Sequence, residues 1–254
     1  MLLSALPAFD DNYIWTLADE AGRTILVDPG EAAPVFAAAA SGLEPAAILL
    51  THHHHDHIGG VPALLERWPA LEVWAPDDAR IATATHRVHD GDRVRVFDAQ
   101  FEVLAVPGHT SSHVAFVGEG IVFCGDTLFS LGCGRMFEGT PAQMLASLQR
   151  LSALDGDTKV CCGHEYTVSN AAFALAVEPD NAALHARATG AHELRADGKM
   201  TVPSTLADER ACNPFLRCSA PAVRQAVEQR LGRVPVDDVE TFAELRRWKD
   251  GFRA

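Results

Sequence analysis

Residues 51 to 57 form a histidine-rich heptad that directly follows a short apolar run. The heptad consists of Thr, four His, Asp and His, and the apolar residues 47–50 before it are typical of a buried β-strand. Imidazole and carboxylate groups held close together are ligands that first-row metals prefer. The run is internal and ends in Gly59-Gly60, unlike a terminal purification tag. We therefore predict a metal-binding loop at the end of a strand.

Alternation along the chain indicates which members of the heptad act together. In an extended segment, neighbouring side chains point to opposite sides. His52, His54 and Asp56 are therefore expected to converge, while the two histidines between them point away. His57 is then expected to come in from the following turn.

Three later segments share one pattern, in which a β-like run ends in glycine and a metal-binding side chain follows. A glycine at this place lets the backbone turn and puts the donor at the mouth of a sheet. A single such segment is more often a turn or a helix cap, and the heptad alone could hold one structural zinc. Repetition favours two metal ions that share a bridging carboxylate. The seven donors are His52, His54, Asp56, His57, His109, Asp126 and His164.

Composition limits the partners of the chain. Its 254 residues, 48% of them hydrophobic, exceed what one compact domain usually needs, so one large domain and a small one are expected. The net charge of −13, from 34 acids against 21 Lys and Arg, argues against a nucleic-acid partner.

The compartment follows from the termini and the cysteines. The N-terminal segment lacks the basic and apolar parts of a secretory signal, and the sequence contains no uncharged stretch of membrane-spanning length, so no membrane partner is expected. The six cysteines form no Cys-x-x-Cys pair, which favours free buried thiols in a reducing cytoplasm.

Periodicity predicts mixed strands and helices up to about residue 165, and a helical domain after it. The strand-like runs, rich in Val, Ile and Phe, are 13–17, 24–27, 47–50, 93–97, 101–106, 113–117, 121–124 and 159–162. Helical spacing and end signals mark 34–40, 62–68, 141–154, 169–177, 181–196, 221–231 and 239–249, with Thr140 as a cap.

The donor pattern of the chain resembles that of the metallo-β-lactamase superfamily, and within it the glyoxalase II (hydroxyacylglutathione hydrolase) family. The superfamily resemblance depends on the metal motif, and the closer one runs nearly from end to end. The stretches that carry it are Asp11-Asn12-Tyr13, 107–110, 125–129, 132–140, 162–167, 177–179, 202–206, 213–217 and 246–250.

The resemblance implies an α/β fold: an αββα sandwich over residues 1–165 and a small all-α, substrate-binding domain over 166–254. It also implies two divalent metal ions, zinc foremost, with iron or manganese as alternatives. His52, His54 and His109 are expected to bind one ion and Asp56, His57 and His164 the other, with Asp126 bridging. Two such ions lower the pKa of water towards ~7 and give a hydroxide nucleophile, so Asp126, Asp56 and His57 are the expected catalytic residues.

The implied activity is hydrolysis of S-D-lactoylglutathione to D-lactate and glutathione, a step of methylglyoxal degradation, by a cytoplasmic monomer. The family's substrate contacts fall on Arg135, Phe137, Tyr166, Arg246 and Lys249. The family usually has Lys in place of Arg135 and Tyr in place of Phe137, so one phenol hydroxyl is missing here. A solvated helix face is the alternative for Arg246 and Lys249.

Other readings of the metal motif stay open at this stage. One is another hydrolase of the same fold, such as a lactonase, a lactamase or a different thioesterase. The other is a di-iron redox module without hydrolysis, although such oxygen-reducing chains normally carry a flavin domain, which is not visible in this sequence.

Overall fold

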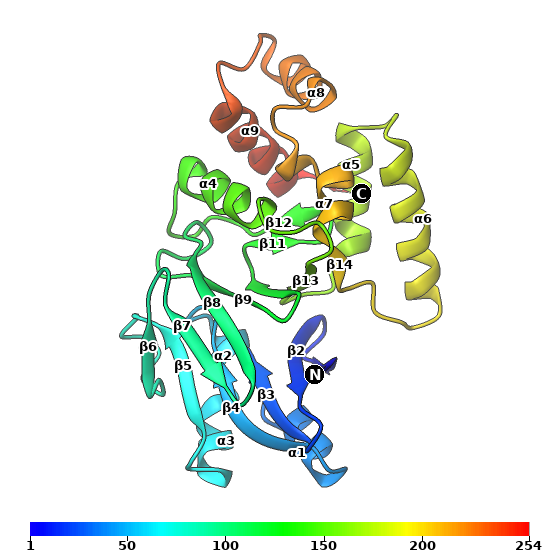
Figure 1. The fold of residues 1–254 in the computed structure, drawn as a ribbon. Helices are drawn as coiled ribbons and strands as arrows, with labels where there is room; N and C mark the ends of the chain where they lie inside the picture. Colours follow the sequence, from blue (N-terminus) through cyan, green and yellow to red (C-terminus); the bar gives the residue numbers. More distant parts are fainter. Residues whose placement is uncertain (254) are drawn as a thin grey trace. The chain divides into compact units, whose positions relative to one another are not determined.

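The computed structural model describes residues 1–253 and divides into two compact units (Figure 1). The first unit comprises Met1–Ala105 and Ser112–Gly125, and the second comprises Val106–Ser111 and Asp126–Ala254. The chain passes between the units more than once, so this division differs from the single boundary predicted at residue 165. That domain boundary remains a prediction.

The first unit contains a mixed six-stranded sheet in which neighbouring strands follow the order of the chain. Its first three strands pair antiparallel, and the remaining pairs are parallel. The strands are β1 (Leu2–Ala8), β2 (Asn12–Ala18), β3 (Arg23–Val27), β4 (Glu44–Leu49), β5 (Glu72–Pro76) and β6 (His86–Val88).

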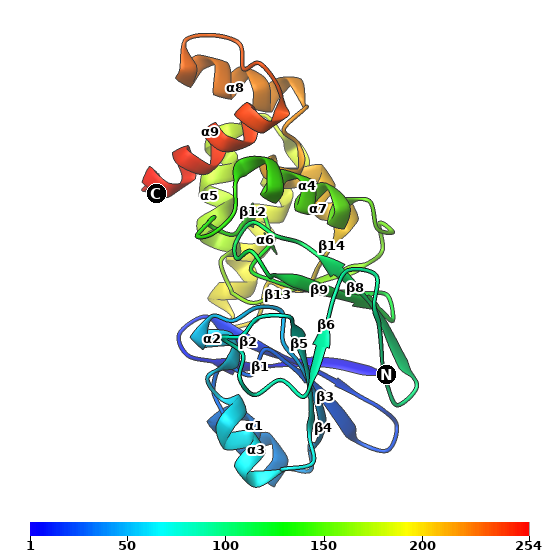
Figure 2. The same ribbon diagram turned by 90° about the vertical axis from the view of Figure 1, so that its left-hand side faces the viewer.

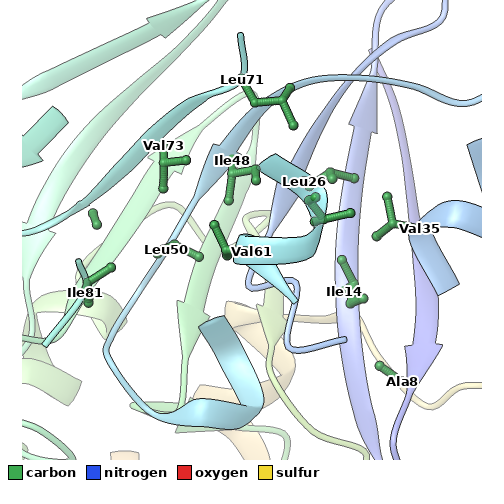
Figure 3. Close-up of a cluster of buried hydrophobic side chains, with 12 residues drawn as sticks. Ala8, Ile14, Leu26, Val35, Ile48, Leu50, Val61, Leu71, Val73 and Ile81 are labelled. Atoms are coloured by element: carbon green, nitrogen blue, oxygen red, sulfur yellow. The ribbon is translucent and has the colours of Figure 1, made fainter. Parts of the chain in front are cut away.

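Two helices, α1 (Ala33–Ala40) and α3 (Val61–Arg67), cover one face of this sheet (Figure 2). Apolar side chains from alternate strand positions meet them in a buried cluster (Figure 3). Burial of this kind contributes roughly 25 cal/mol per Å² of apolar surface and holds the sheet in place. The fully buried members are Ile14, Leu26, Val35, Ile48, Leu50, Val61, Leu64, Val73, Ala75 and Ile81.

Four antiparallel strands form a second layer of the first unit, in the order β10-β9-β8-β7. The two layers contact each other at the start of β3, where Arg23 lies over the ring of Phe97, and just after β4, where the Thr51 carbonyl accepts from the Val114 amide at 2.9 Å. The strands are β7 (Arg93–Val96), β8 (Ala99–Ala105), β9 (Val114–Gly118) and β10 (Ile121–Gly125).

The second unit is mainly helical and contains two short strand pairs. β13 (Lys159–Cys162) pairs antiparallel with β14 (Ser204–Thr205), and β11 (Leu128–Phe129) pairs with β12 (Gly132–Cys133). The helices are α4 (Pro141–Ser152), α5 (Thr167–Val177), α6 (Ala182–Ala196), α7 (Leu206–Cys212), the 3₁₀ turn η1 (Pro214–Leu216), α8 (Pro221–Leu231) and α9 (Asp238–Gly251).

Every predicted strand and helix is present, with ends that differ by a few residues. Thr140 caps α4 as predicted: its hydroxyl accepts from the Gln143 amide, and the Gln143 side chain accepts from the Thr140 amide. The periodicity analysis missed the short elements β6, β11, β12, β14, α2 (His55–Ile58) and α7, and also β1 and β5.

The helices and the cysteines bear on the expectations about membranes and disulfides. No helix within residues 1–253 combines the length and apolar character needed to cross a membrane. The six cysteines are buried and free, as predicted.

Candidate functional site

The histidine-rich heptad starts as extended backbone after β4 and then turns into the short helix α2. His54 is the N-cap residue, with φ −61° and ψ 144°, and its carbonyl accepts from the amides of His57 and Ile58. Asp56 therefore lies in the first turn of a helix, and the prediction of extended backbone through Asp56 is wrong. Alternation with a period of two fails because the His54 carbonyl closes a helical turn.

The first part of the heptad keeps the predicted alternation. His52 Nε2 and His54 Nδ1 lie 3.1 Å apart, whereas His53 Nδ1 lies 3.6 Å from Asp78 and His55 is exposed. Two imidazole nitrogens at that distance repel each other unless they share a proton or a cation. The pair therefore fits a metal ion.

A buried carboxylate, that of Asp28, determines the orientation of two of these imidazoles. Asp28 accepts from the Thr51 amide at 2.8 Å, from the Thr51 hydroxyl at 2.6 Å and from His57 Nδ1 at 3.0 Å. Because the Thr51 hydroxyl proton is used by Asp28, its oxygen accepts from His52 Nδ1 at 3.0 Å. Both rings therefore keep the Nε2 lone pair for a metal ion.

Asp28 itself is better placed to orient ligands than to bind metal. One of its oxygens lies within 4.8 Å of donor atoms of His52 and His57. Its carboxylate, however, already accepts three hydrogen bonds. The sequence analysis missed this residue, although it directly follows β3 and precedes Pro29-Gly30, a donor at a strand end like those already identified.

Asn12 orients Asp56 through hydrogen bonds, as Asp28 orients the two imidazoles. Its side-chain amide donates to Asp56 Oδ2 at 3.1 Å and to the Asp56 carbonyl at 3.3 Å. Asp56 Oδ2 also lies 3.6 Å from His57 Nε2. Asn12 belongs to the Asp-Asn-Tyr stretch of the family resemblance, but no role had been predicted for it.

The strand end before Asp126 requires glycine. Gly125, the last residue of β10, has φ +47°, a conformation that side chains rarely adopt. A Cβ atom there would lie 2.3 Å from Thr51 Oγ1 and 2.9 Å from the His113 ring. The predicted sharp turn is present at this position.

The second unit brings together the other three predicted donors. Asp126 Oδ2 lies 3.5 Å from His109 Nε2 and 3.3 Å from His164 Nε2. All three side chains are buried. His109 Nδ1 donates to the Arg135 carbonyl at 2.8 Å, so its Nε2 keeps a lone pair towards Asp126. A carboxylate between two imidazoles is the geometry that a bridging ligand needs.

Aromatic side chains lie against these donors within the second unit. The Tyr166 ring stacks on His164 with centroids 4.7 Å apart, and Phe129 presents its edge to both rings. Phe137 meets His109 edge-on at 5.2 Å and is 64% exposed. Two of the predicted substrate contacts, Tyr166 and Phe137, therefore adjoin predicted metal ligands.

Two of the three predicted cationic contacts, Arg135 and Arg246, lie beside one carboxylate, that of Asp250. Arg246 Nη2 lies 3.0 Å from Asp250 and Arg135 Nε lies 3.5 Å from it. Arg246 also donates to the Cys133 carbonyl at 2.7 Å, and Lys249 donates to the Ser169 carbonyl at 3.0 Å. Two arginines therefore share the Asp250 carboxylate, and Lys249, on the same helix as Arg246, donates to a neutral carbonyl.

Burial separates the two cations of α9. Arg246 is only 5% exposed, so the alternative of a solvated helix face is wrong for this residue. Its buried Nε has no hydrogen-bond acceptor among residues 1–253. Burial, and next the charge of Arg246, lowers the pKa of Lys249 to about 8. The two cations therefore differ: Arg246 is buried with one unused donor, and Lys249 is partly desolvated.

Comparisons with known proteins agree with the fold. Residues 10–164 match the metallo-β-lactamase superfamily, and residues 165–252 match the hydroxyacylglutathione hydrolase C-terminus. Hydroxyacylglutathione hydrolase of Xylella fastidiosa is 58% identical over 252 residues, which cover 99% of this chain and 98% of that protein. Hydroxyacylglutathione hydrolase of Xanthomonas euvesicatoria is 59% identical over 255 residues, with both chains fully covered.

Solved structures give the same architecture. The crystal structure of ETHE1 from Myxococcus xanthus aligns with a TM-score of 0.67 and 26% identity, over 100% of this chain and 92% of that one. The crystal structure of BLEG-1 B3 metallo-β-lactamase aligns with a TM-score of 0.63 and 23% identity, over 85% of this chain and 99% of that one. The predicted fold, a metallo-β-lactamase fold with a C-terminal helical part, is confirmed.

Proposed function

The chain belongs to the hydroxyacylglutathione hydrolase family of the metallo-β-lactamase superfamily, and from that premise we propose that it hydrolyses S-D-lactoylglutathione to D-lactate and glutathione. One observation within the second unit supports this choice of substrate. Two predicted substrate contacts touch predicted metal ligands there. The Arg135 carbonyl accepts from His109, and the Tyr166 ring stacks on His164.

The chain holds groups of His and carboxylate donors of the kind that bind divalent metals. We propose that His52, His54 and His109 bind one ion, that Asp56, His57 and His164 bind a second, and that Asp126 bridges them. Held by these residues, divalent cations would lower the pKa of water and polarise a carbonyl oxygen. Zinc is the proposed metal, with iron or manganese as alternatives, because imidazole and carboxylate donors suit all three.

Residues behind the donors prepare them for that task. Asp28 and the Thr51 hydroxyl hold the Nδ1 protons of His57 and His52. The Arg135 carbonyl holds that of His109. Each of these three imidazoles therefore has its Nε2 lone pair ready before a ligand arrives, and fixed ligand orientation raises metal affinity.

The cationic cluster of the second unit is proposed to bind the glycine carboxylate of glutathione. Lys249 and Arg246 lie three residues apart on α9. Arg135 and Arg246 both lie beside the carboxylate of Asp250. The aromatic rings of Tyr166 and Phe137 are proposed to contact the peptide part. Phe137 lacks a hydroxyl, so it contributes apolar contact without a hydrogen bond.

A thioester suits this site because its leaving group needs little help. Hydrolysis breaks the bond between the acyl carbon and sulfur, and the thiol has a pKa near ~8.5, so it can depart as thiolate at neutral pH. An amine leaving group would instead need a proton donor. The family membership and this chemistry favour the same substrate class.

We further propose that the protein acts as a monomer in the cytoplasm. The buried free thiols support a reducing compartment. Sedimentation of the purified chain, expected at 27.3 kDa, tests the oligomeric state.

The function is tested by metal analysis of the purified protein together with thiol release from several thioesters. We expect two divalent ions per chain and turnover of lactoylglutathione well above that of a small thioester without the tripeptide. Two bound ions with equal turnover on both substrates would contradict the glutathione assignment.

A further inference from the structure

Asp78, between β5 and β6, has a buried carboxylate that collects partners from three segments of the first unit. Its side chain is 6% exposed. Oδ2 accepts from the Ser112 hydroxyl at 2.6 Å and from Arg80 Nη2 at 2.7 Å, and it lies 3.6 Å from His53 Nδ1. Oδ1 accepts from the amide and from Nε of Arg80, both at 2.9 Å.

The backbone that carries this carboxylate is itself held firmly. Arg87, in β6, donates to the carbonyls of Pro76, Asp78 and Ile81 at 3.0, 2.7 and 2.8 Å. One planar guanidinium thereby fixes three points of a single turn. The Asp78 side chain consequently extends from a rigid base.

Its partners His53 and Ser112 lie beside predicted parts of the metal site. His53 separates His52 from His54, whose facing nitrogens are 3.1 Å apart. Ser112 precedes His113, whose ring stacks on His52 with centroids 4.6 Å apart and an interplanar angle of 16°. A shift of either partner would move the His52 ring or its support.

A backbone bond links the same two segments. The Val114 amide donates to the Thr51 carbonyl at 2.9 Å. The Asp78 carboxylate adds a second connection between them: it accepts from the Ser112 hydroxyl at 2.6 Å and makes a longer polar contact, 3.6 Å, with His53 Nδ1. Two connections restrict rotation of one segment against the other, which a single connection does not.

We propose that Asp78 is a positioning residue of the metal site, which holds the segment of His52 and His54 in register with residues 112–114. The inference rests on the proposed metal-dependent function. The hydrogen bonds from Arg80 hold the pKa of Asp78 well below its usual range, despite the opposing effect of burial. The carboxylate therefore stays charged over the range in which the histidines can bind metal.

The test compares Asp78→Asn with the wild-type protein in metal affinity, measured by competition with a chromophoric chelator, and in the visible spectrum of the Co(II)-substituted protein. Loss of an outer-shell partner typically weakens metal binding 10- to 100-fold. Because Asp78 acts one contact further out, we expect about a tenfold loss and a shifted Co(II) band. KM at saturating metal should be unchanged.

Two matched comparisons separate positioning from general damage. Asp77→Asn removes the neighbouring carboxylate, which is 68% exposed, and should leave affinity and spectrum unchanged. Ser112→Ala should weaken metal binding in the direction of Asp78→Asn, and Ser112→Thr, which keeps a hydroxyl, should restore it.

Wild-type metal affinity and spectrum in Asp78→Asn, with only a lower melting temperature, would overturn the proposal. If Asp78→Asn fails to fold, equal affinities of Ser112→Ala and the wild type would overturn it instead. A wild-type protein that binds two metals but hydrolyses no glutathione thioester would contradict the proposed function alone, since the metal affinities of the variants would still test Asp78.

Discussion

His57 Nδ1 lies 3.0 Å from the Asp28 carboxylate, and their side chains are only 1% and 4% exposed. The pair determines which ring nitrogen of His57 carries the proton, because the carboxylate can only accept. Its other ring nitrogen then faces Asp56 Oδ2 at 3.6 Å. Asp28 thereby orients a proposed metal ligand without being a proposed ligand itself.

Asp28→Asn is expected to weaken metal binding about 10- to 100-fold, with a matching loss of activity at limiting metal. Asparagine can accept at only one of its two terminal atoms, so a donor from Thr51 or His57 loses its acceptor. Chelator competition measures the effect. Asp98→Asn, at an exposed position, is the control and should behave as wild type. Unchanged affinity in Asp28→Asn would remove Asp28 from the site.

Asp126→Ala is expected to abolish most thioester hydrolysis, by at least about a hundredfold, because even outer-shell changes cost about 10- to 100-fold. Without the proposed bridge, two cations repel each other, and at least one should be lost. Metal content and circular dichroism are measured alongside thiol release, so that loss of metal is told apart from loss of fold. Near-normal turnover with two bound metals would exclude Asp126 as the bridge.

Substrate affinity is expected to fall as pH rises through the pKa of Lys249. That pKa is lowered to about 8, so the ammonium is mostly present at pH 7 and mostly lost at pH 9. An anionic substrate prefers the charged form, and KM for a glutathione thioester should rise over this window. Lys249→Arg keeps its charge and should show a flatter profile. An identical rise in both proteins would show that another group titrates.

Lys249→Ala is expected to raise KM about tenfold or more and leave kcat nearly unchanged. A charge-assisted bond contributes ~1.5–3 kcal/mol, and a contact far from the reacting carbonyl acts equally on ground and transition states. Lys199→Ala, which removes a lysine that is 64% exposed, is the matched control. A small thioester without the tripeptide should not distinguish Lys249→Ala from wild type.

Arg246→Ala tests substrate binding less specifically than Lys249→Ala, although both residues lie on α9. Arg246 is buried and bonds to the Cys133 carbonyl and Asp250, so truncation takes a donor from that carbonyl and an ion pair from Asp250. We expect a lower melting temperature together with a higher KM. Thermal unfolding of the two single variants separates the contributions, since Lys249→Ala should unfold close to wild type.

The sequence allowed most of the fold to be predicted, because its longer elements have clear periodicity. Runs such as Ile121–Gly125 are continuously apolar, and α4 starts with a capping box. The missed strands lack those signals. β1 contains Pro7 and is largely exposed, and β6, β11, β12 and β14 are too short to show a period.

The donors could be predicted, but their support could not. His52 and His54 follow strand alternation, whereas Asp56 departs from it because a four-residue helix begins at His55. Asp28 contacts His57, which lies 29 positions further along the chain, and Asn12 contacts Asp56, which lies 44 positions further along. Such pairings depend on the tertiary fold, which spacing in one sequence does not reveal.

Burial of the six free cysteines limits their reaction with oxidants. Burial raises the pKa of five of the six thiols, for Cys133 and Cys212 to about 11 and for Cys162 to about 12. Exchange with a disulfide requires an accessible thiolate, and at neutral pH these groups supply almost none. The folded chain should therefore stay free of mixed disulfides even in concentrated glutathione disulfide, and its intact mass after such treatment should equal that of the unmodified polypeptide.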